Sequence, residues 1–280
     1  MKKLIGVDFN KTSWSRYLEN KRKVEKFLKK VYNRTDMKIG QIDLKFIKDL
    51  EYYFKTDLKL SQATINRSLQ RVKKVILFAI SEKYIETNPF ILYRPTKYKI
   101  NLIYLTTDEL EKLENHTFSQ QRLEQVRDMF IFCCYTGLAY AEMSNLQPKH
   151  LEKDQHGNYW INMYRQKTQQ YFSVPILHKA YTILEKYKEV EKDRCLPKIS
   201  NQKFNSYIKE VCLIAGIEKK ITHHVARKTF ATTVLLYNEV PMEIVSELLG
   251  HSKITITQEH YAKVVKKSLS IHLKKLDKAL

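Results

Sequence analysis

The chain has 280 residues, enough for two modest domains that each bury a core of their own. Its 43% hydrophobic and 11% aromatic residues exclude a disordered or elastic chain. The sequence contains neither a signal peptide nor an apolar run of about 18 residues, so we expect a cytoplasmic protein without contact to a membrane. The formal net charge of +20 favours a polyanionic partner, and nucleic acid ranks ahead of an ordinary solvated basic surface.

The excess charge is concentrated at the front of the chain. Residues 1–98 carry 23 Lys and Arg against 10 Asp and Glu, whereas the remaining 182 residues carry 27 against 20. The first third is therefore the part that we expect to hold phosphates.

Apolar residues recur at helical spacing through the first hundred residues and predict three helices. The third begins near Ser61 and is expected to stop at TNPF (87–90), where Pro89 ends the helical pattern. Four cations surround its apolar stripe and are candidate DNA contacts, the alternative being an ordinary wet face: Arg67, Arg71, Lys73 and Lys74.

Residues 94–104 have no helical stripe and predict an extended linker. A capping box at Thr106 to Glu109 then opens a helix, and a second helix ends at Gly137. Residues 155–174 predict strands, with a turn at HGN (156–158) and alternation after it. Further helices are expected around 178–190, 201–215, 224–237, 241–249 and 255–265. The fold class is therefore mainly α with a small antiparallel β-sheet.

The four cysteines have no C-x-x-C spacing, so they predict no zinc site. Cys133, Cys134 and Cys212 lie in apolar helical patterns and are expected to be small core residues. Four histidines in the last third (His223, His224, His251 and His260) have neither the spacing nor the acidic partners of a metal site, and we expect no metal and no cofactor.

Three stretches carry residues suited to phosphodiester chemistry. ITHHVARKTFATT (221–233) places His224 and Arg227 three apart at the start of a helix, where Thr222 is the expected cap. LLGHSKITITQEHYAKV (248–264) supplies His251 and Tyr261, and RQKTQQYFSVPI (165–176) supplies Lys167 beside a tight hairpin.

Breaking a phosphodiester without metal requires a nucleophile, cations for the non-bridging oxygens and an acid for the leaving hydroxyl. A tyrosine can attack phosphorus, guanidinium groups bind the oxygens in a bidentate way, and lysine or histidine can transfer the proton. Each residue alone is a weak signal, since the chain has 18 tyrosines and nine histidines. The set, in its order and spacing, is far more specific.

The chain resembles the tyrosine recombinases (phage integrase family), and most of all the integrases of conjugative and mobilisable transposons from Bacteroidetes. TGLAYAEM, RQKT, HHVARKTFAT, LLGH and TQEHYAKV follow in the family's order. The resemblance implies a helical, SAM-like core-binding domain over 1–98, a linker over 99–105, and a mixed α/β catalytic domain over 106–280. It also implies site-specific recombination of double-stranded DNA by a homotetramer on two synapsed sites, in a bacterial, nucleoid-associated protein.

Carried over by position, the resemblance makes Tyr261 the nucleophile that forms a 3′-phosphotyrosine. It makes Arg227 the second arginine, with His224 as its companion base and His251 as the further histidine. Lys167 becomes the general acid of the hairpin. Glu142 matches a carboxylate that buttresses the arginines, although a surface helix carboxylate is an equal alternative.

The family's first arginine belongs where Ala139 stands. Three interpretations of this alanine compete. The site is inactive and the chain is a DNA-binding or architectural protein, or the site works slowly with one arginine, or another guanidinium takes the place of the missing one. We favour the last interpretation, because a dead site has less reason to keep the rest of the set. Arg165, two residues before Lys167, is the first candidate and Arg127 on the preceding helix is the second, the alternative for either being a surface ion pair.

Three further expectations come from the resemblance. Integrases of this type commonly carry an arm-type DNA-binding domain before the core-binding domain, whereas Met1 stands almost at the core-binding helices; a truncated chain and a naturally short recombinase both fit. A helix over about 266–280 is expected to dock on a neighbouring protomer, packing on its own domain being the alternative. A host DNA-bending factor is a possible partner.

Overall fold

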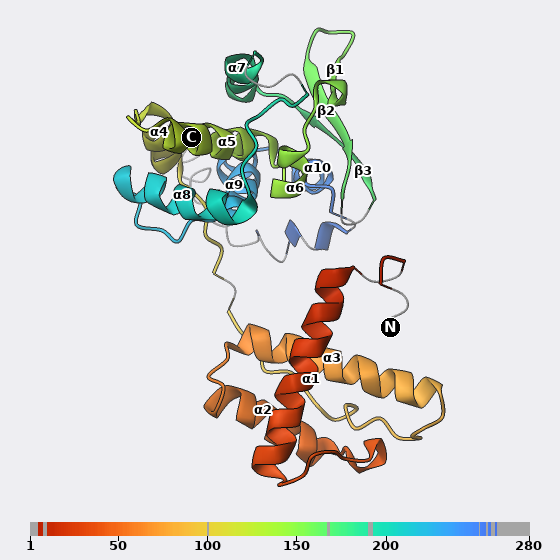
Figure 1. Cartoon of the computed structure of the whole chain (residues 1–280). Coiled ribbons are helices and arrows are strands. Elements are labelled where there is room, and N and C mark those ends of the chain that lie inside the picture. The colour runs from red at the N-terminus through yellow and green to blue at the C-terminus, as the bar shows by residue number, and fades with distance from the viewer. Residues whose placement is uncertain are drawn as a thin grey trace, which may run out of the picture. The chain divides into compact units, whose positions relative to one another are not determined.

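The computed structural model divides the chain into two compact units, residues 1–99 and residues 100–280. It describes residues 5–7, 10–99, 101–166, 169–189, 193–251, 253–255, 257–258 and 261. The first unit is helical, and the second combines helices with one antiparallel sheet (Figure 1). This arrangement confirms the predicted fold class.

Three helices form the first unit: α1 (Lys11–Val31), α2 (Leu44–Thr56) and α3 (Gln62–Ser81), with a short 3₁₀ turn η2 (Ile39–Gln41) between the first two. Their apolar stripes meet in one core, in which five side chains are fully buried: Phe27, Ile47, Leu50, Phe54 and Ile65. Asn10 and Asp43 cap α1 and α2 by accepting hydrogen bonds from the backbone N–H groups of Ser13 and Phe46, each at 2.7 Å.

Helix α3 begins after Ser61 as predicted but ends at Ser81, well before Pro89. Lys83 adopts a left-handed backbone conformation with φ 59°, and the N–H of Tyr84 reaches back to the carbonyl of Ala79 at 2.9 Å. This closure terminates the helix without a glycine. The prediction that Pro89 ends the helix is therefore wrong.

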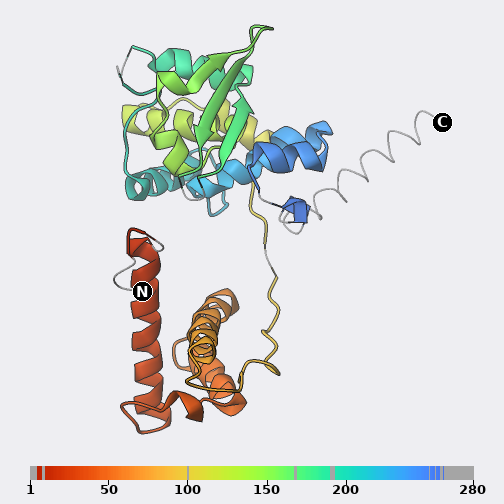
Figure 2. The ribbon, with the colours of Figure 1, turned by 90° about the vertical axis from the view of Figure 1, so that its right-hand side faces the viewer.

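In the second unit, helix α5 (Gln121–Thr136) packs against four other helices, as the two views in Figures 1 and 2 show. These neighbours are α4 (Thr107–Asn115), α7 (His178–Tyr187), α8 (Asn201–Ile214) and α9 (His223–Thr229). Residues 129–134 of α5 are buried on every side, as is typical of a central helix. The expected core cysteines Cys133, Cys134 and Cys212 are all buried.

Short elements complete the second unit. The predicted helix over 224–237 is α9 continued by a π-helical turn, η4 (Phe230–Leu235), and a 3₁₀ turn, η5 (Leu236–Asn238). The remaining elements are α6 (Tyr140–Ser144), η3 (Pro148–His150) and α10 (Met242–Leu248). The capping box at Thr106 is present, with Thr106 and Glu109 each accepting from the other's backbone N–H.

The sheet has three antiparallel strands in the order β1 (Leu151–Lys153), β2 (Tyr159–Tyr164) and β3 (Tyr171–Pro175). The predicted HGN turn joins the first two, and Gly157 takes φ 85° there. Ile161 and Val174 face each other and are fully buried, so the sheet packs one face on the core. Strand β1, which lies before residue 155, was not predicted.

The end of the predicted linker belongs to the second unit. Leu105 is fully buried, and its backbone N–H donates to the Thr229 hydroxyl at 2.9 Å. Thr233 donates its hydroxyl proton to the Leu105 carbonyl, and the hydroxyls of Tyr104 and Tyr237 hydrogen-bond at 2.8 Å. The segment just before α4 is therefore docked rather than free.

Some expectations fall outside the described residues. They include Lys167 and the exchange helix over 266–280. Within the part of the chain that the structure describes, no helix is both long and apolar enough to cross a membrane.

Candidate active site

Helix α9 carries two of the candidate residues, His224 and Arg227, on one face. Thr222 stands at the cap position in an extended conformation, but its side chain makes no capping hydrogen bond, contrary to expectation. Asn205 of α8 supplies a capping hydrogen bond instead, because its side-chain oxygen accepts from the N–H of His223 at 2.9 Å. The start of α9 is therefore fixed by a neighbouring helix.

The guanidinium of Arg227 connects the ends of two helices. Nη1 donates to the carbonyl of Gly137, the left-handed residue that ends α5, at 2.8 Å. Nη2 donates to the carbonyl of Leu249, which follows α10. Burial, and then the positive charge of Arg165, lower the pKa of Arg227 to about 10.

Arg165, directly after β2, reaches the same carbonyl. Its Nη2 donates to Leu249 O at 2.8 Å, so one carbonyl oxygen accepts from both guanidinium groups. Nη1 lies 3.7 Å from the Glu142 carboxylate, and Arg165 and Glu142 are only 7% and 5% exposed. Within the described part of the chain, Nε of Arg165 and Oε2 of Glu142 have no hydrogen-bond partner. Two buried cations thus face one carboxylate, which leaves a positive excess suited to an anion.

Tyr261 interacts electrostatically with Arg227, one of these two arginines. Its side chain is 5% exposed, and burial raises the pKa of its hydroxyl to about 12 although the charge of Arg227 acts to lower it. Arg227 and Tyr261 therefore act on each other's charge within this site.

His251 follows Gly250 immediately after the shared Leu249 carbonyl. Its Nδ1 is 2.8 Å from the hydroxyl oxygen of Thr257, whose side chain is fully buried. That contact orients the imidazole. His224 is exposed at the first turn of α9, one turn before Arg227. Thr257 was not singled out from the sequence, since a threonine six residues after a histidine has no distinctive pattern.

Ala139 borders the cluster. It is the residue before α6, two positions after the carbonyl that Arg227 binds, and Glu142 lies one turn further along. Helix α6, which follows Ala139, therefore contributes the carboxylate that faces Arg165. Lys167, two residues beyond Arg165, lies outside the described residues.

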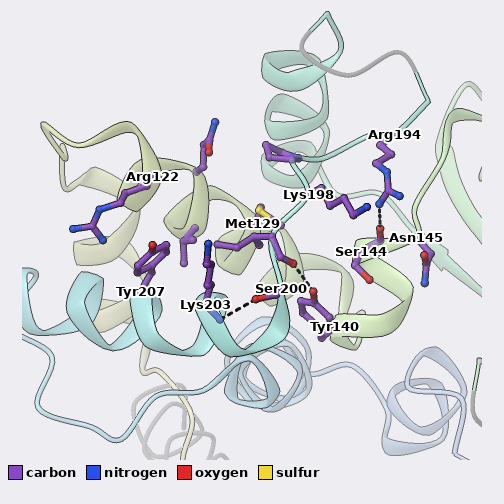
Figure 3. Close-up of a pocket in the computed structure, with 14 residues that line it drawn as sticks. Arg122, Met129, Tyr140, Ser144, Asn145, Arg194, Lys198, Ser200, Lys203 and Tyr207 are labelled. Atoms are coloured by element: carbon purple, nitrogen blue, oxygen red, sulfur yellow. Dashed lines mark hydrogen bonds between the residues drawn. The ribbon is translucent and has the colours of Figure 1, made fainter.

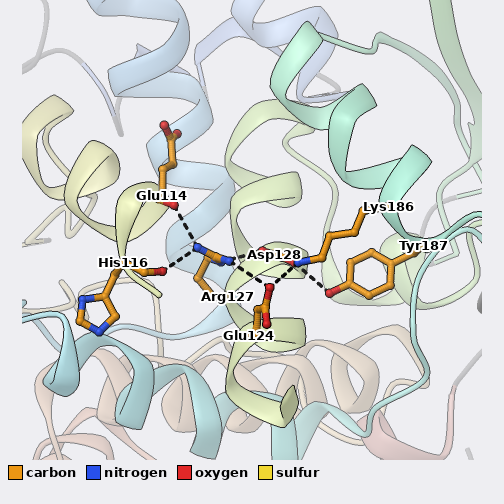
Figure 4. A network of polar contacts seen from close by, with 7 residues as sticks. All are labelled: Glu114, His116, Glu124, Arg127, Asp128, Lys186 and Tyr187. Atoms are coloured by element: carbon orange, nitrogen blue, oxygen red, sulfur yellow. Dashed lines mark hydrogen bonds and ion pairs between the residues drawn. The ribbon is translucent and has the colours of Figure 1, made fainter. Parts of the chain in front are cut away.

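Arg127 does not join this cluster (Figure 4). Its Nη1 donates to the carbonyls of Glu114 and His116 at 2.9 and 2.8 Å, and its Nε lies 2.6 Å from the Asp128 carboxylate. It stands ten residues before Gly137 on α5, about 15 Å along the helix axis. The expectation that Arg127 substitutes for the missing arginine conflicts with this placement, because its guanidinium ties α4 to α5.

The first unit has a basic groove of about 280 Å³ between α1 and α3. Arg67 and Arg71 line it, whereas Lys73 and Lys74 are exposed and do not. Helix α1 adds Arg16 and Lys23, which were not among the predicted DNA contacts. Their signal was the spacing of 16, 20 and 23 on one helical face. Two of the four expected DNA contacts are thus gathered in one groove.

A second cationic surface lies in the second unit (Figure 3). Lys198, Lys203, Arg122 and Arg194 line a pocket of about 720 Å³, and no Asp or Glu is among its described lining residues. Arg122 is held by a bidentate ion pair with Glu210, with both distances 2.9 Å. The described residues contain no group of three or more His, Cys, Asp or Glu side chains that could hold a metal ion.

A helical unit rich in cations, followed by a mixed unit in which two arginines share a carbonyl and one of them interacts with a buried tyrosine, fits a tyrosine recombinase. Residues 104–268 match the phage integrase family and residues 2–100 match the phage integrase SAM-like domain. The chain belongs to the phage integrase family, whose members are site-specific DNA recombinases.

Similar proteins span most of the chain. Tyrosine recombinase XerD of Oceanobacillus iheyensis is 27% identical over 222 residues, which is 74% of this chain and 73% of the relative. XerC of Pediococcus pentosaceus is 24% identical and covers 95% of this chain and 91% of its own length.

Two solved structures share the fold. The lambda integrase (75–356) dimer bound to a COC′ core site has TM-score 0.75 and 17% identity, over 92% of this chain and 91% of that one. The Tn1549 transposon integrase (82–397) in complex with circular intermediate DNA has TM-score 0.75 and 18% identity, over 97% and 96%.

Proposed function

We propose that Tyr261 carries out site-specific recombination of double-stranded DNA, with Arg165 in place of the missing first arginine. The observation that carries this proposal is the convergence of the Arg165 and Arg227 guanidiniums on the Leu249 carbonyl, together with the electrostatic interaction of Arg227 with Tyr261. A scissile phosphate would replace that carbonyl as the partner of the donors that now share it.

In the proposed reaction the Tyr261 oxygen forms a bond to phosphorus while the bond from phosphorus to the 5′ oxygen breaks. The phenol proton passes to His224, and Lys167 protonates the leaving 5′ oxygen. Arg165 and Arg227 hold the non-bridging oxygens as charge develops on them, and His251 supports them. Attack by a 5′-hydroxyl of the partner strand reverses these steps and joins the new strand.

The raised pKa of Tyr261 supports the need for a base. At neutral pH the buried phenol is protonated, so attack requires proton removal as the bond forms. Arg227 favours the phenolate electrostatically, and a bound phosphate brings its own negative charge. The proton acceptor therefore has to stand at the site itself.

The cationic groove between α1 and α3 and the pocket around Lys198 and Lys203 support binding of the DNA backbone. We further propose that four protomers act on two synapsed sites in association with the bacterial nucleoid, with a DNA-bending factor as an assisting partner.

The test uses a nicked suicide duplex that carries a site selected by this protein from random DNA. The wild-type chain is expected to form a covalent adduct that Tyr261→Phe cannot form and that Arg165→Ala reduces at least a hundredfold with DNA affinity retained. Equal inertness of wild type and Tyr261→Phe would refute the proposal.

A second candidate is a DNA-binding protein with a defunct site, which Ala139 favours. It predicts salt-sensitive binding of the same duplex without an adduct. One covalent complex at Tyr261 rules it out.

A further inference from the structure

Two residues outside the reacting set bracket the guanidinium of Arg165. Phe172 on β3 is 4% exposed, and its ring centroid lies 4.1 Å from Arg165 Cζ. A Cβ placed on Gly250 would lie 3.1 Å from Nε, 3.3 Å from Nη2 and 3.6 Å from Cζ of the same guanidinium. Because Cζ is the farthest of the three atoms, Gly250 abuts the Nε–Nη2 edge. We call Phe172 and Gly250 together the Arg165 slot.

The slot restricts the orientation of a long side chain that has few other polar contacts. Arg165 stands at the end of a strand on a side chain with four torsions, and burial lowers its pKa. Among the described residues its carboxylate partner is Glu142, which lies 3.7 Å from Nη1, a distance longer than a hydrogen bond. An aromatic face attracts a desolvated guanidinium and restricts it to one plane. The space at Gly250 lets the edge of that plane reach the Leu249 carbonyl.

We propose that Phe172 and Gly250 are positioning residues that hold Arg165 for phosphate binding, so that the hairpin supplies the substitute arginine and one side of its slot, and the turn after α10 supplies the other side. This inference rests on the proposed function of Arg165. Neither residue touches the DNA in this scheme, and both act through the guanidinium.

Phe172→Leu tests the slot, because leucine preserves an apolar side chain of similar volume and removes the ring. The matched control is Phe118→Leu, a 6% exposed phenylalanine whose ring lies 5.9 Å from the guanidinium of Arg127. At saturating suicide substrate, Phe172→Leu is expected to form the adduct about tenfold more slowly with unchanged DNA affinity. Phe118→Leu is expected to react at the wild-type rate, and equal slowing of both variants would overturn the proposal.

A neutral phosphate separates positioning from general distortion. A methylphosphonate at the scissile position has one anionic oxygen fewer, so it needs less stabilisation from a guanidinium. The defects of Arg165→Ala and Phe172→Leu are both expected to shrink on this substrate. A Phe172→Leu defect that stays at full size would show that the ring acts elsewhere.

Side-chain hydrogen exchange gives a readout that needs no reaction. In the ¹⁵N-arginine-labelled full chain, the buried Nε–H of Arg165 is expected to exchange slowly with solvent. Its exchange rate should rise at least tenfold over the wild type in Phe172→Leu and stay at the wild-type value in Phe118→Leu. If the wild type formed no adduct, the proposed function would fail. The exchange rate would still test whether Phe172 restrains the Arg165 guanidinium. Unchanged exchange in Phe172→Leu would overturn the slot.

Discussion

Arg127 and Arg165 carry the same charge, so charge alone does not tell which of them holds the scissile phosphate. Replacing each by methionine should distinguish a structural role from a role in cleavage. Arg127 donates to two backbone carbonyls at the end of α4 and is paired with Asp128, which is 5% exposed. Arg165 donates to one carbonyl and stands near a second guanidinium. We expect Arg127→Met to lose stability and Arg165→Met to lose cleavage.

The magnitude follows from the partners that remain. Removing one member of a buried ion pair costs about 3–5 kcal/mol. Asp128 keeps Lys186 and Tyr187, each at 2.8 Å, so we place Arg127→Met at the lower end, about 3 kcal/mol. For a unit of this size that corresponds to a fall in Tm of about 6–12 °C. Arg165→Met leaves Glu142 near Arg227 and relieves repulsion between the arginines, so its cost should stay near about 1 kcal/mol.

The two tryptophans make the assay specific. Trp14 lies in the first unit and Trp160 on β2 in the second. In a Trp14→Phe background, urea unfolding followed by fluorescence therefore reports on the second unit. Adduct formation is measured in parallel, well below the Tm of each variant.

The reasoning would be refuted by the opposite pattern. If Arg127→Met unfolded at the wild-type urea concentration yet formed no adduct, its guanidinium would belong to the reaction. If Arg165→Met formed the adduct at the wild-type rate, another cation would hold the phosphate.

Three further predictions follow from the same structure. Burial lowers the pKa of His223 to about 4 from 6.5, so its contribution to stability is complete above pH 6.5 and is lost as the pH falls through 4. The loss should reach about 3 kcal/mol at pH 4 and be absent in His223→Gln, as measured by unfolding at each pH. Gly250→Ala combines a left-handed backbone (φ 58°) with a Cβ 3.1 Å from Nε of Arg165, and should destabilise the chain by about 1 kcal/mol and slow adduct formation more than tenfold. A wild-type rate would contradict the close approach. Arg67→Ala should reduce the slope of log affinity against log salt by about one, whereas Lys73→Ala, outside the groove, should change it less; equal effects would count against the groove.

Local signals predicted the elements that depend on adjacent residues. The capping box at Thr106 and the alternation over 159–164 need only their neighbours in the chain, and both appear as expected. The end of α3 did not follow from such a signal. Lys83 adopts a left-handed backbone conformation at a position where glycine is usual, and a lysine in the sequence does not predict that conformation.

The order and spacing of the motifs determined the family and the kind of chemistry, because a nucleophile, cations and imidazoles must be encoded as side chains. Which arginine shares an acceptor with Arg227 was decided only by the tertiary structure. Arg127 and Arg165 differ in their surroundings, and these come from α4, α6 and α10, which are remote in sequence. The shared acceptor is the backbone carbonyl of Leu249, and a carbonyl is common to every residue. Its position therefore exists only once the helix ends have packed together.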